Sequence, residues 1–85
     1  MERLHDLKLS WAFWNEVMSG EKCFELREND RGFQKGDQVL FREVDKKGTL
    51  TGRTSGNFEI TYVLHGWGMK ENYVAFGIKK SISDV

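Results

Sequence analysis

Apolar and polar residues alternate with a period of two in several short runs of this 85-residue chain. Successive side chains of a strand point to opposite faces, so each run predicts a strand with one buried face. Gly, Asn, Asp and Ser separate the runs, and the chain contains no proline. These residues are typical of turns. The pattern predicts a mainly β protein with strands over residues 4–9, 22–27, 38–45, 58–64 and 72–78.

The second run lies within Gly20–Asp37, GEKCFELRENDRGFQKGD, where charged residues are interleaved with apolar ones. Alternation places Phe24 and Leu26 on one face, which we expect to point into the core. It places Glu25 and Arg27 on the other face. One interpretation is an edge strand whose charges pair with neighbouring strands. The other, which we favour, is a polar cleft that faces a ligand.

A short helix is expected between the first and second runs. Ser10 is a good N-cap, and Gly20 stands where a helix ends in a left-handed residue. Trp11, Trp14 and Met18 recur at helical spacing between them. We therefore expect a helix that packs this aromatic stripe on the sheet.

The other runs have equally clear faces. Residues 49–53 are expected to continue a hairpin, 54–57 to form a polar loop, and 79–85 to be a frayed tail. His5 is interpreted as a packing residue, with ligand binding as the alternative. The residues expected to share one face within their run are His5, Leu7 and Leu9; Val39, Phe41 and Glu43; and Phe58, Ile60, Tyr62 and Leu64.

The length indicates a single domain over residues 1–85. With one helix and several strands, its expected class is α+β and mainly β. Short twisted strands of this kind tend to curl into a small barrel, which removes exposed edges. No long apolar run or signal-like segment is present, so we expect a protein without membrane contact. Cys23 is the only cysteine, which fits a reducing cytoplasm and a small packed residue.

Charge and motifs narrow the function classes. Thirteen basic and thirteen acidic residues give a formal net charge of zero, so any nucleic-acid contact is expected to be short. No zinc-ligand spacing, phosphate-loop glycine pattern or Ser/His/Asp set occurs. We therefore expect no metal and no cofactor.

The words HDLKL, GEKCFELRENDRGFQKGD, ITYVL and GMKENYVAF follow one another across residues 5–78. In this order they resemble the ASCH superfamily, in particular a small bacterial and phage subgroup with a GxKxFExRxNDRxFxxGD signature. The resemblance implies a small PUA-like pseudo-barrel of five or six strands with one short helix after the first strand. It also implies a cleft beside the GxKxFExR strand that binds RNA or a nucleotide-like ligand.

Some small ASCH proteins are amidohydrolases that remove an acetyl group from modified cytidine. The resemblance places their essential lysine at Lys22. A threonine three residues later is replaced here by Glu25, and their helical glutamate has only Glu71 as a substitute. The chain therefore departs from the enzyme pattern at two positions.

Five charged residues of the central stretch are the candidate ligand-binding residues: Lys22, Glu25, Arg27, Asp30 and Arg31. Lys22 and Glu25 are also the candidate catalytic pair if the protein is an enzyme, because a lysine beside a carboxylate can act as a base, a nucleophile or an anion anchor. Strict alternation separates these two side chains unless Lys22 lies in the turn before the strand. Asp30 and Arg31 are expected to have mainly structural roles.

Three functional hypotheses follow. The first is a module that binds a nucleotide or short single-stranded RNA. The second is a metal-free amidohydrolase acting on an acylated nucleoside such as acetylcytidine. The third is a protein-interaction domain in which the charged strand contacts a partner.

Overall fold

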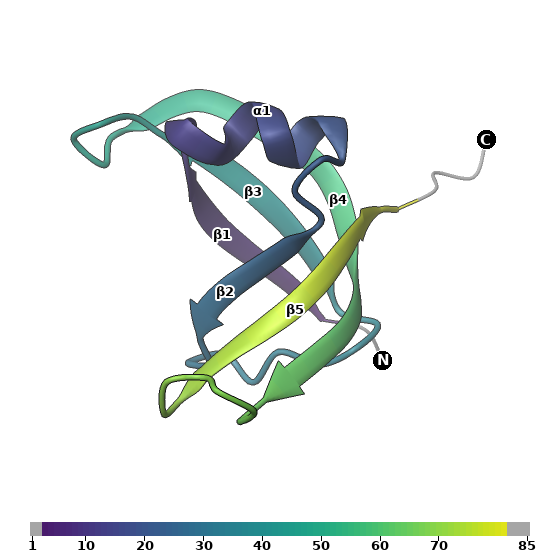
Figure 1. Cartoon of the computed structure of the whole chain (residues 1–85). Coiled ribbons are helices and arrows are strands. Elements are labelled where there is room, and N and C mark those ends of the chain that lie inside the picture. Colours follow the sequence, from purple (N-terminus) through teal and green to yellow (C-terminus); the bar gives the residue numbers. More distant parts are fainter. Residues whose placement is uncertain (1–2, 82–85) are drawn as a thin grey trace.

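The computed structural model describes residues 3–81, which form one five-stranded sheet and one helix (Figure 1). The elements in chain order are β1 (Leu4–Ser10), α1 (Trp11–Ser19), β2 (Phe24–Glu28), β3 (Gln38–Val44), β4 (Leu50–His65) and β5 (Tyr73–Lys80). The prediction of a mainly β domain with one short helix after the first strand is confirmed, with five strands.

The sheet curls into a half-barrel with the strand order β1-β3-β4-β5-β2. β1 pairs parallel with β3, and the other neighbours pair antiparallel. The edge strands β1 and β2 leave a seam without backbone pairing, which the side chain of Arg27 crosses. Its Nη2 donates a hydrogen bond of 2.7 Å to the carbonyl of Lys8. At this seam the two edge strands are therefore joined by a side chain and not by the backbone pairing of a closed barrel.

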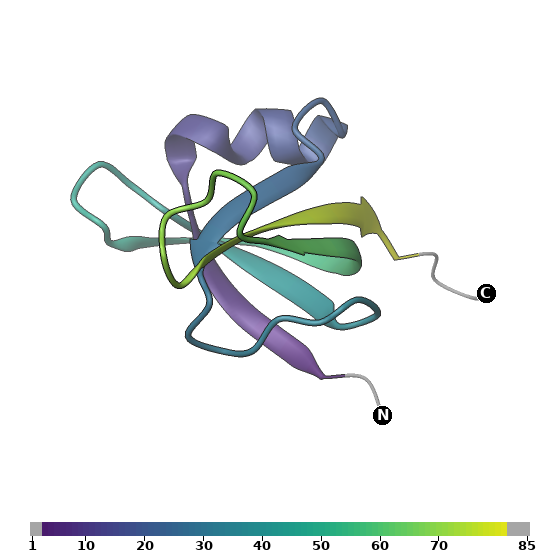
Figure 2. The same ribbon diagram turned by 60° about the horizontal axis from the view of Figure 1, so that its bottom comes forward.

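Two segments cover the ends of the half-barrel. α1 crosses one end, and the connection from β2 to β3, residues 29–37, crosses the other (Figures 1 and 2). Phe33 in this connection is buried, with its ring centroid 4.8 Å from that of His5 and 4.7 Å from that of Phe76. His5 is thus a buried packing residue, as its place beside Leu7 on the strand predicts.

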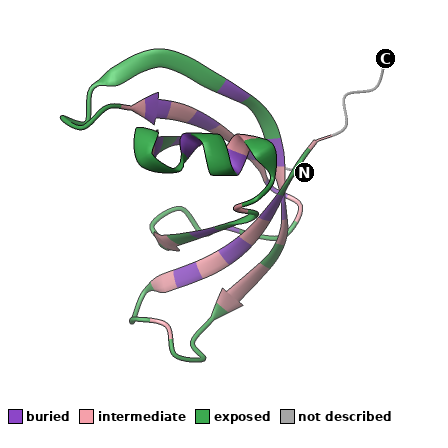
Figure 3. Ribbon diagram, turned by 45° about the horizontal axis from the view of Figure 1, so that its top comes forward, coloured by how far each residue is buried: buried purple, intermediate pink, exposed green. Residues whose placement is uncertain are grey.

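Alternation of buried and less buried residues runs along the strands, as Figure 3 shows. The predicted inward faces of β1 and β3 are confirmed. The apolar residues of the core are Leu7, Leu9, Trp14, Val17, Phe33, Val39, Phe41, Phe58, Ile60, Val74, Phe76 and Ile78. Each strand except β2 contributes to this set, so the core lies inside the curl of the sheet and under α1.

The predicted helix caps are confirmed, but its buried stripe is narrower than expected. The Ser10 hydroxyl accepts a hydrogen bond of 3.2 Å from the Ala12 amide, and Gly20 ends the helix with φ 85°. Trp14 is buried, whereas Trp11 and Phe13 are about half exposed. A helix of nine residues presents only one face to the sheet, and the remaining aromatic rings lie at its margins.

The faces of β2 are the reverse of the prediction. Phe24 and Leu26 are 52% and 57% exposed, whereas Glu25 is only 4% exposed. Antiparallel partners share a face, and Glu25 pairs in register with Phe76, which lies in the core. Once the register with β5 is set, Glu25 must point inward. The inward-pointing carboxylate is stabilised because cationic side chains at the open seam pair with it.

Exposure of Phe24 changes the expected effect of its truncation. Phe24→Ala should lower the free energy of unfolding by less than about 1 kcal/mol, because surface substitutions remove little packing. Thermal or urea unfolding measures this value, with Phe41→Ala as the control that creates a buried cavity. Equal losses in the two variants would contradict the observed orientation of β2.

β4 is longer and less regular than the predicted strand. Residues 54–57, expected as a polar loop, lie within β4. Ser55 is buried there, and its hydroxyl accepts a 2.9 Å hydrogen bond from the Phe41 amide. A register shift between Ile60 and Tyr62 then reverses the alternation. Tyr62 is consequently exposed, and the prediction of a face shared with Phe58 and Ile60 is wrong.

Two further predictions need correction. Lys79 and Lys80 belong to β5, so the frayed tail does not begin at residue 79. Ser81 also has a defined place, since its amide donates a 2.9 Å hydrogen bond to the Asn57 carbonyl, and residues 82–85 of the expected tail lie outside the described residues. Cys23 is exposed and is not the small packed residue that was expected.

Candidate functional site

Lys22 lies in the turn between α1 and β2, before regular pairing begins. Its backbone amide donates a 2.9 Å hydrogen bond to the Glu16 carbonyl, which continues the helix end marked by Gly20. From this turn the side chain folds back over the start of β2. Its Nζ donates to the Phe24 carbonyl at 2.9 Å and to Glu25 Oε1 at 3.0 Å. The condition under which Lys22 and Glu25 can meet is therefore fulfilled.

Two aromatic rings flank the Lys22 ammonium. Nζ lies 5.2 Å from the ring centroid of Phe13 on α1 and 4.9 Å from that of Phe24 on β2. Both distances are within the range of cation–π attraction. Since both rings are about half exposed, they also offer apolar surface beside the charge.

Glu25 is the buried centre of a three-residue cluster, which we call the Lys22 cluster: Lys22, Glu25 and Arg27. Arg27 Nε and Nη2 donate to Glu25 Oε2 at 3.2 and 3.1 Å, opposite the Lys22 contact on Oε1. The carboxylate side chain is 5% exposed, whereas those of Lys22 and Arg27 are 20% and 24% exposed. With two cations and one anion, the cluster has a formal excess of one positive charge that water and ligands can reach.

A cavity of about 320 Å³ opens at the Lys22 cluster beside the seam. Its size is at the lower end of the range for small-molecule sites. The residues lining it are Leu9, Ser10, Phe13, Lys22, Phe24, Glu25, Leu26 and Arg27. Aromatic, aliphatic, cationic and anionic groups thus converge in a space suited to one small ligand.

The sequence profile of one protein family, described as a domain of unknown function (DUF3850), matches residues 4–78. The chain belongs to the DUF3850 family. The match covers all of β1, α1, β2, β3 and β4, and it therefore includes every residue of the Lys22 cluster. The family description assigns no activity to this DUF3850 domain.

The DUF3850 chain is also similar to a curated phage protein. It is 34% identical over 53 residues to the uncharacterized 12.9 kDa protein in the GpA 3' region of Escherichia phage P2. The aligned region covers 62% of this chain and 48% of the phage protein. The chain thus spans about half the length of that relative.

Asp30 and Arg31 do not join the Lys22 cluster of the DUF3850 chain. They lie in the connection after β2, are both largely exposed, and approach each other only to 3.9 Å. Together with Arg27 they line a different cavity of about 460 Å³, which lies further along the same seam. Asn29 performs the turn function expected of Asp30, because its Oδ1 accepts a 3.0 Å hydrogen bond from the Phe33 amide.

A second buried charge in this DUF3850 domain was missed at the sequence level, where Gly36 and Asp37 indicate a simple turn. Asp37 Oδ2 accepts hydrogen bonds from His5 Nε2 at 2.8 Å, from Arg3 Nη2 at 3.0 Å and from the Gln34 amide at 3.1 Å. Burial favours a higher pKa, but the bonds from His5, Gln34 and Arg3 together hold the pKa of Asp37 below its ordinary value. The inward position of His5 on β1 is the sequence signal for this pair.

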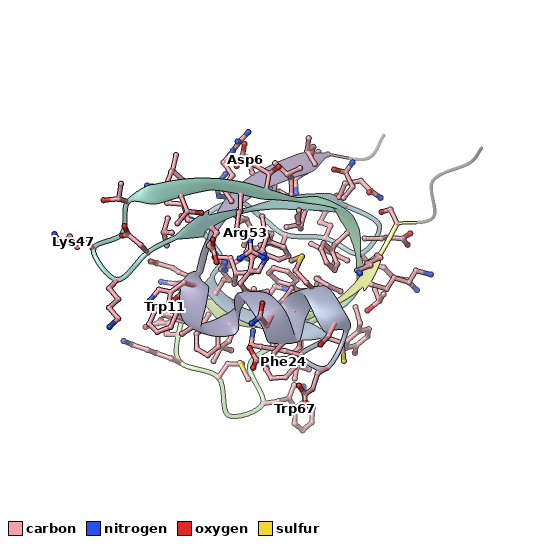
Figure 4. The ribbon with its side chains drawn as sticks, turned by 90° about the horizontal axis from the view of Figure 1, so that it is seen from above. Asp6, Trp11, Phe24, Lys47, Arg53 and Trp67 are labelled. Atoms are coloured by element: carbon pink, nitrogen blue, oxygen red, sulfur yellow. The ribbon has the colours of Figure 1, made fainter. Side chains whose placement is uncertain are left out.

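A third charged group joins the β3–β4 hairpin to α1. Glu43 is buried and accepts a 2.7 Å hydrogen bond from the Thr51 hydroxyl, with Arg53 Nη1 at 3.6 Å. The Arg53 guanidinium also lies 5.0 Å from the Trp14 ring centroid, between β4 and the helix in Figure 4. These contacts hold the helix over the sheet, so we assign this group to the fold.

Further hollows lie away from the Lys22 cluster. One of about 1000 Å³ is lined by residues of the β3–β4–β5 margin, among them Glu59, Lys79 and Lys80, together with Met18. Its buried Ser55 hydroxyl is already bonded to the Phe41 amide and the Gly56 carbonyl. Glu71 lines a separate cavity near the β4–β5 turn, so it does not take part in the Lys22 cavity.

Within residues 3–81 no group of three His, Cys, Asp or Glu side chains is arranged to hold a metal ion. Over the same range, no helix has the length and apolar character needed to cross a membrane.

Proposed function

We propose that the Lys22 cluster binds one nucleotide, either free or as a unit of a short single-stranded RNA. The observation that carries the proposal is the Lys22 ammonium held between two half-exposed rings above the buried Glu25 carboxylate. Aromatic faces stack with bases regardless of their identity. The chain is then interpreted as an ASCH-type, PUA-like module, in agreement with the resemblance of its central stretch.

The donors and acceptors of the cluster match a nucleotide. Lys22 has three N–H donors, of which two are used by Phe24 and Glu25, so one is free for a phosphate oxygen. The Glu25 carboxylate offers about four acceptor sites and receives three hydrogen bonds from Lys22 and Arg27. One acceptor site is left for the amino group of a base. Carboxylates accept in this way from the amino group of cytosine.

Electrostatics and size support a small anion over a long strand. The positive excess of the cluster attracts a phosphate, and contacts with charged partners are stronger than neutral ones. A cavity of about 320 Å³ accommodates a single base with its sugar more readily than an extended chain. The balanced charge of the whole protein is consistent with this.

Nucleotide binding is tested by titrating the protein with nucleoside monophosphates and short RNA oligonucleotides in a calorimeter. We expect Lys22→Met to weaken binding by about 10-fold or more, because a hydrogen bond to a charged group is lost. Lys70→Met is the matched control, since Lys70 also lies over a ring, that of Tyr73, but outside the Lys22 cavity. Equal affinity in Lys22→Met and wild type, or no binding by wild type, would reject the proposal.

A second candidate, amidohydrolase activity on an acylated nucleoside, is supported by the 3.0 Å contact between Lys22 Nζ and Glu25 Oε1. This distance permits proton transfer between a lysine and a carboxylate. The same Nζ, however, donates to both the Phe24 carbonyl and Glu25, which is the arrangement of an anion anchor. Incubation with acetylcytidine distinguishes the two functions: turnover that disappears in Lys22→Met supports the enzyme, and binding without turnover supports the module.

A further inference from the structure

The convex side of the sheet carries apolar side chains on three neighbouring strands, and we call this surface the outer face. On it, Gly77 of β5 lies in register between Phe24 of β2 and Tyr62 of β4. The next row repeats the arrangement, with Leu26 and Leu64 on either side of Ala75. The outer face is thus made of Phe24, Leu26, Tyr62, Leu64, Ala75 and Gly77.

The Thr61 hydroxyl of β4 lies over Gly77 at the centre of the outer face. A Cβ added at Gly77 would collide with the Thr61 hydroxyl, so only glycine fits this position without a shift. The large side chains of β2 and β4 stand beside it. A partner surface can therefore contact all three strands at once.

Three large apolar side chains of the outer face are more than half exposed. Phe24, Leu26 and Tyr62 are 52%, 57% and 63% exposed, and Trp67 in the turn after β4 is 88% exposed. Phe24 and Trp67 lie on the same side of the molecule in Figure 4. Since a large aromatic side chain buries about 150–250 Å² when covered, the roughly half-exposed Phe24 and Tyr62 together with Leu26 present roughly 300 Å² on the outer face. The largest patches on monomers measure about 300–600 Å² and are often functional.

Charges of both signs border the outer face at its two ends. At one end Glu59 pairs in register with Lys79. At the other end Glu28 pairs in register with Tyr73, over whose ring the Lys70 ammonium lies at 5.4 Å. A two-fold rotation about the centre of the face brings one end against the other, so opposite charges of two copies can meet.

We propose that the outer face binds a second copy of this chain and forms a symmetric dimer. In a standard interface of roughly 800 Å² per partner, the apolar patch supplies the core and the charged residues supply the rim. Phe, Tyr and Trp are also enriched at such interfaces. Single-stranded nucleic acid is less suited to this surface, because Glu28 and Glu59 would face its phosphates.

The mass of the full chain in solution tests the proposal. Analytical ultracentrifugation over a range of micromolar concentrations should show twice the monomer mass of 9.9 kDa for the wild type. Tyr62→Asp should weaken self-association by about 30-fold or more, as loss of a central interface residue does. Phe24 and Leu26 belong to the outer face but also line the Lys22 cavity. Tyr62 does not line it, so nucleotide binding by this variant is expected to persist.

Leu50→Asp is the matched control, because Leu50 lies on the same strand with 52% exposure but outside the outer face. Circular dichroism establishes that both variants fold. A monomeric wild type, or equal association in the two variants, would overturn the proposal. A monomer whose binding to a labelled oligouridylate is lost in Tyr62→Asp would instead assign the outer face to nucleic acid.

Discussion

Replacing Glu25 by glutamine should lower the free energy of unfolding by about 3 kcal/mol, because two cations then lose their buried partner. The side chain of Glu25 is 5% exposed and holds Lys22 on one oxygen and Arg27 on the other. Glutamine keeps the size of the side chain but is neutral and replaces one oxygen by an NH₂ group, so only one of the two cations retains a hydrogen-bond acceptor. Urea unfolding at neutral pH measures the loss. The same variant should lose nucleotide affinity, since Lys22 and Arg27 are no longer held in place.

Two comparisons make the result specific to the cluster. Glu28→Gln alters an exposed carboxylate on the same strand and is expected to leave the unfolding free energy within about 0.5 kcal/mol of wild type. Glu25→Gln combined with Lys22→Met should cost less than the sum of the single changes, because residues in one ion-pair network do not behave additively. Strict additivity would show that Lys22 and Glu25 are not energetically coupled.

Acidification should destabilise the protein in a way that depends on Asp37. The folded-state pKa of this carboxyl is lowered, whereas in the unfolded chain it has its ordinary value near 3.8. As the pH falls toward and below that value, the unfolded state binds the proton first, so the free energy of unfolding decreases. The stabilisation that Asp37 contributes is fully present above the pKa of the carboxyl in the unfolded chain. It is lost as the pH falls through the lower pKa of the same carboxyl in the folded protein. Urea unfolding at a series of acidic pH values measures this decrease.

Asp37→Asn should abolish this component of the acid dependence. At neutral pH it should lower the unfolding free energy by about 2–3 kcal/mol, since charge-assisted hydrogen bonds from His5 and Arg3 are lost. Asp30→Asn is the control, because that carboxylate is exposed and only 3.9 Å from Arg31. If the unfolding free energies of wild type and Asp37→Asn ran parallel through acidic pH, the assigned role of Asp37 would be wrong.

Much of the secondary structure is determined locally and could be predicted from the sequence. Period-two alternation predicts the inward faces of β1 and β3, because side-chain direction in a strand follows from backbone geometry. Ser10 and Gly20 predict the limits of α1, because their cap conformations need no distant partner. The same turn at Gly20 allows Lys22 to reach Glu25, a contact that the sequence left conditional on Lys22 lying before the strand. The pairing of Glu25 with Arg27 followed from their shared face.

Tertiary structure alone decided the remaining features, because each depends on residues far apart in the chain. The faces of β2 were set by its register with β5, which outweighed the apolar character of Phe24 and Leu26. Asp30 and Arg31 lie outside the Lys22 cavity, because the β2–β3 connection leads away from it. Asp37 became a buried carboxylate through contact with His5, 32 positions earlier. Alternation reports that a strand has two faces, but only the neighbouring strands determine which of them meets the core.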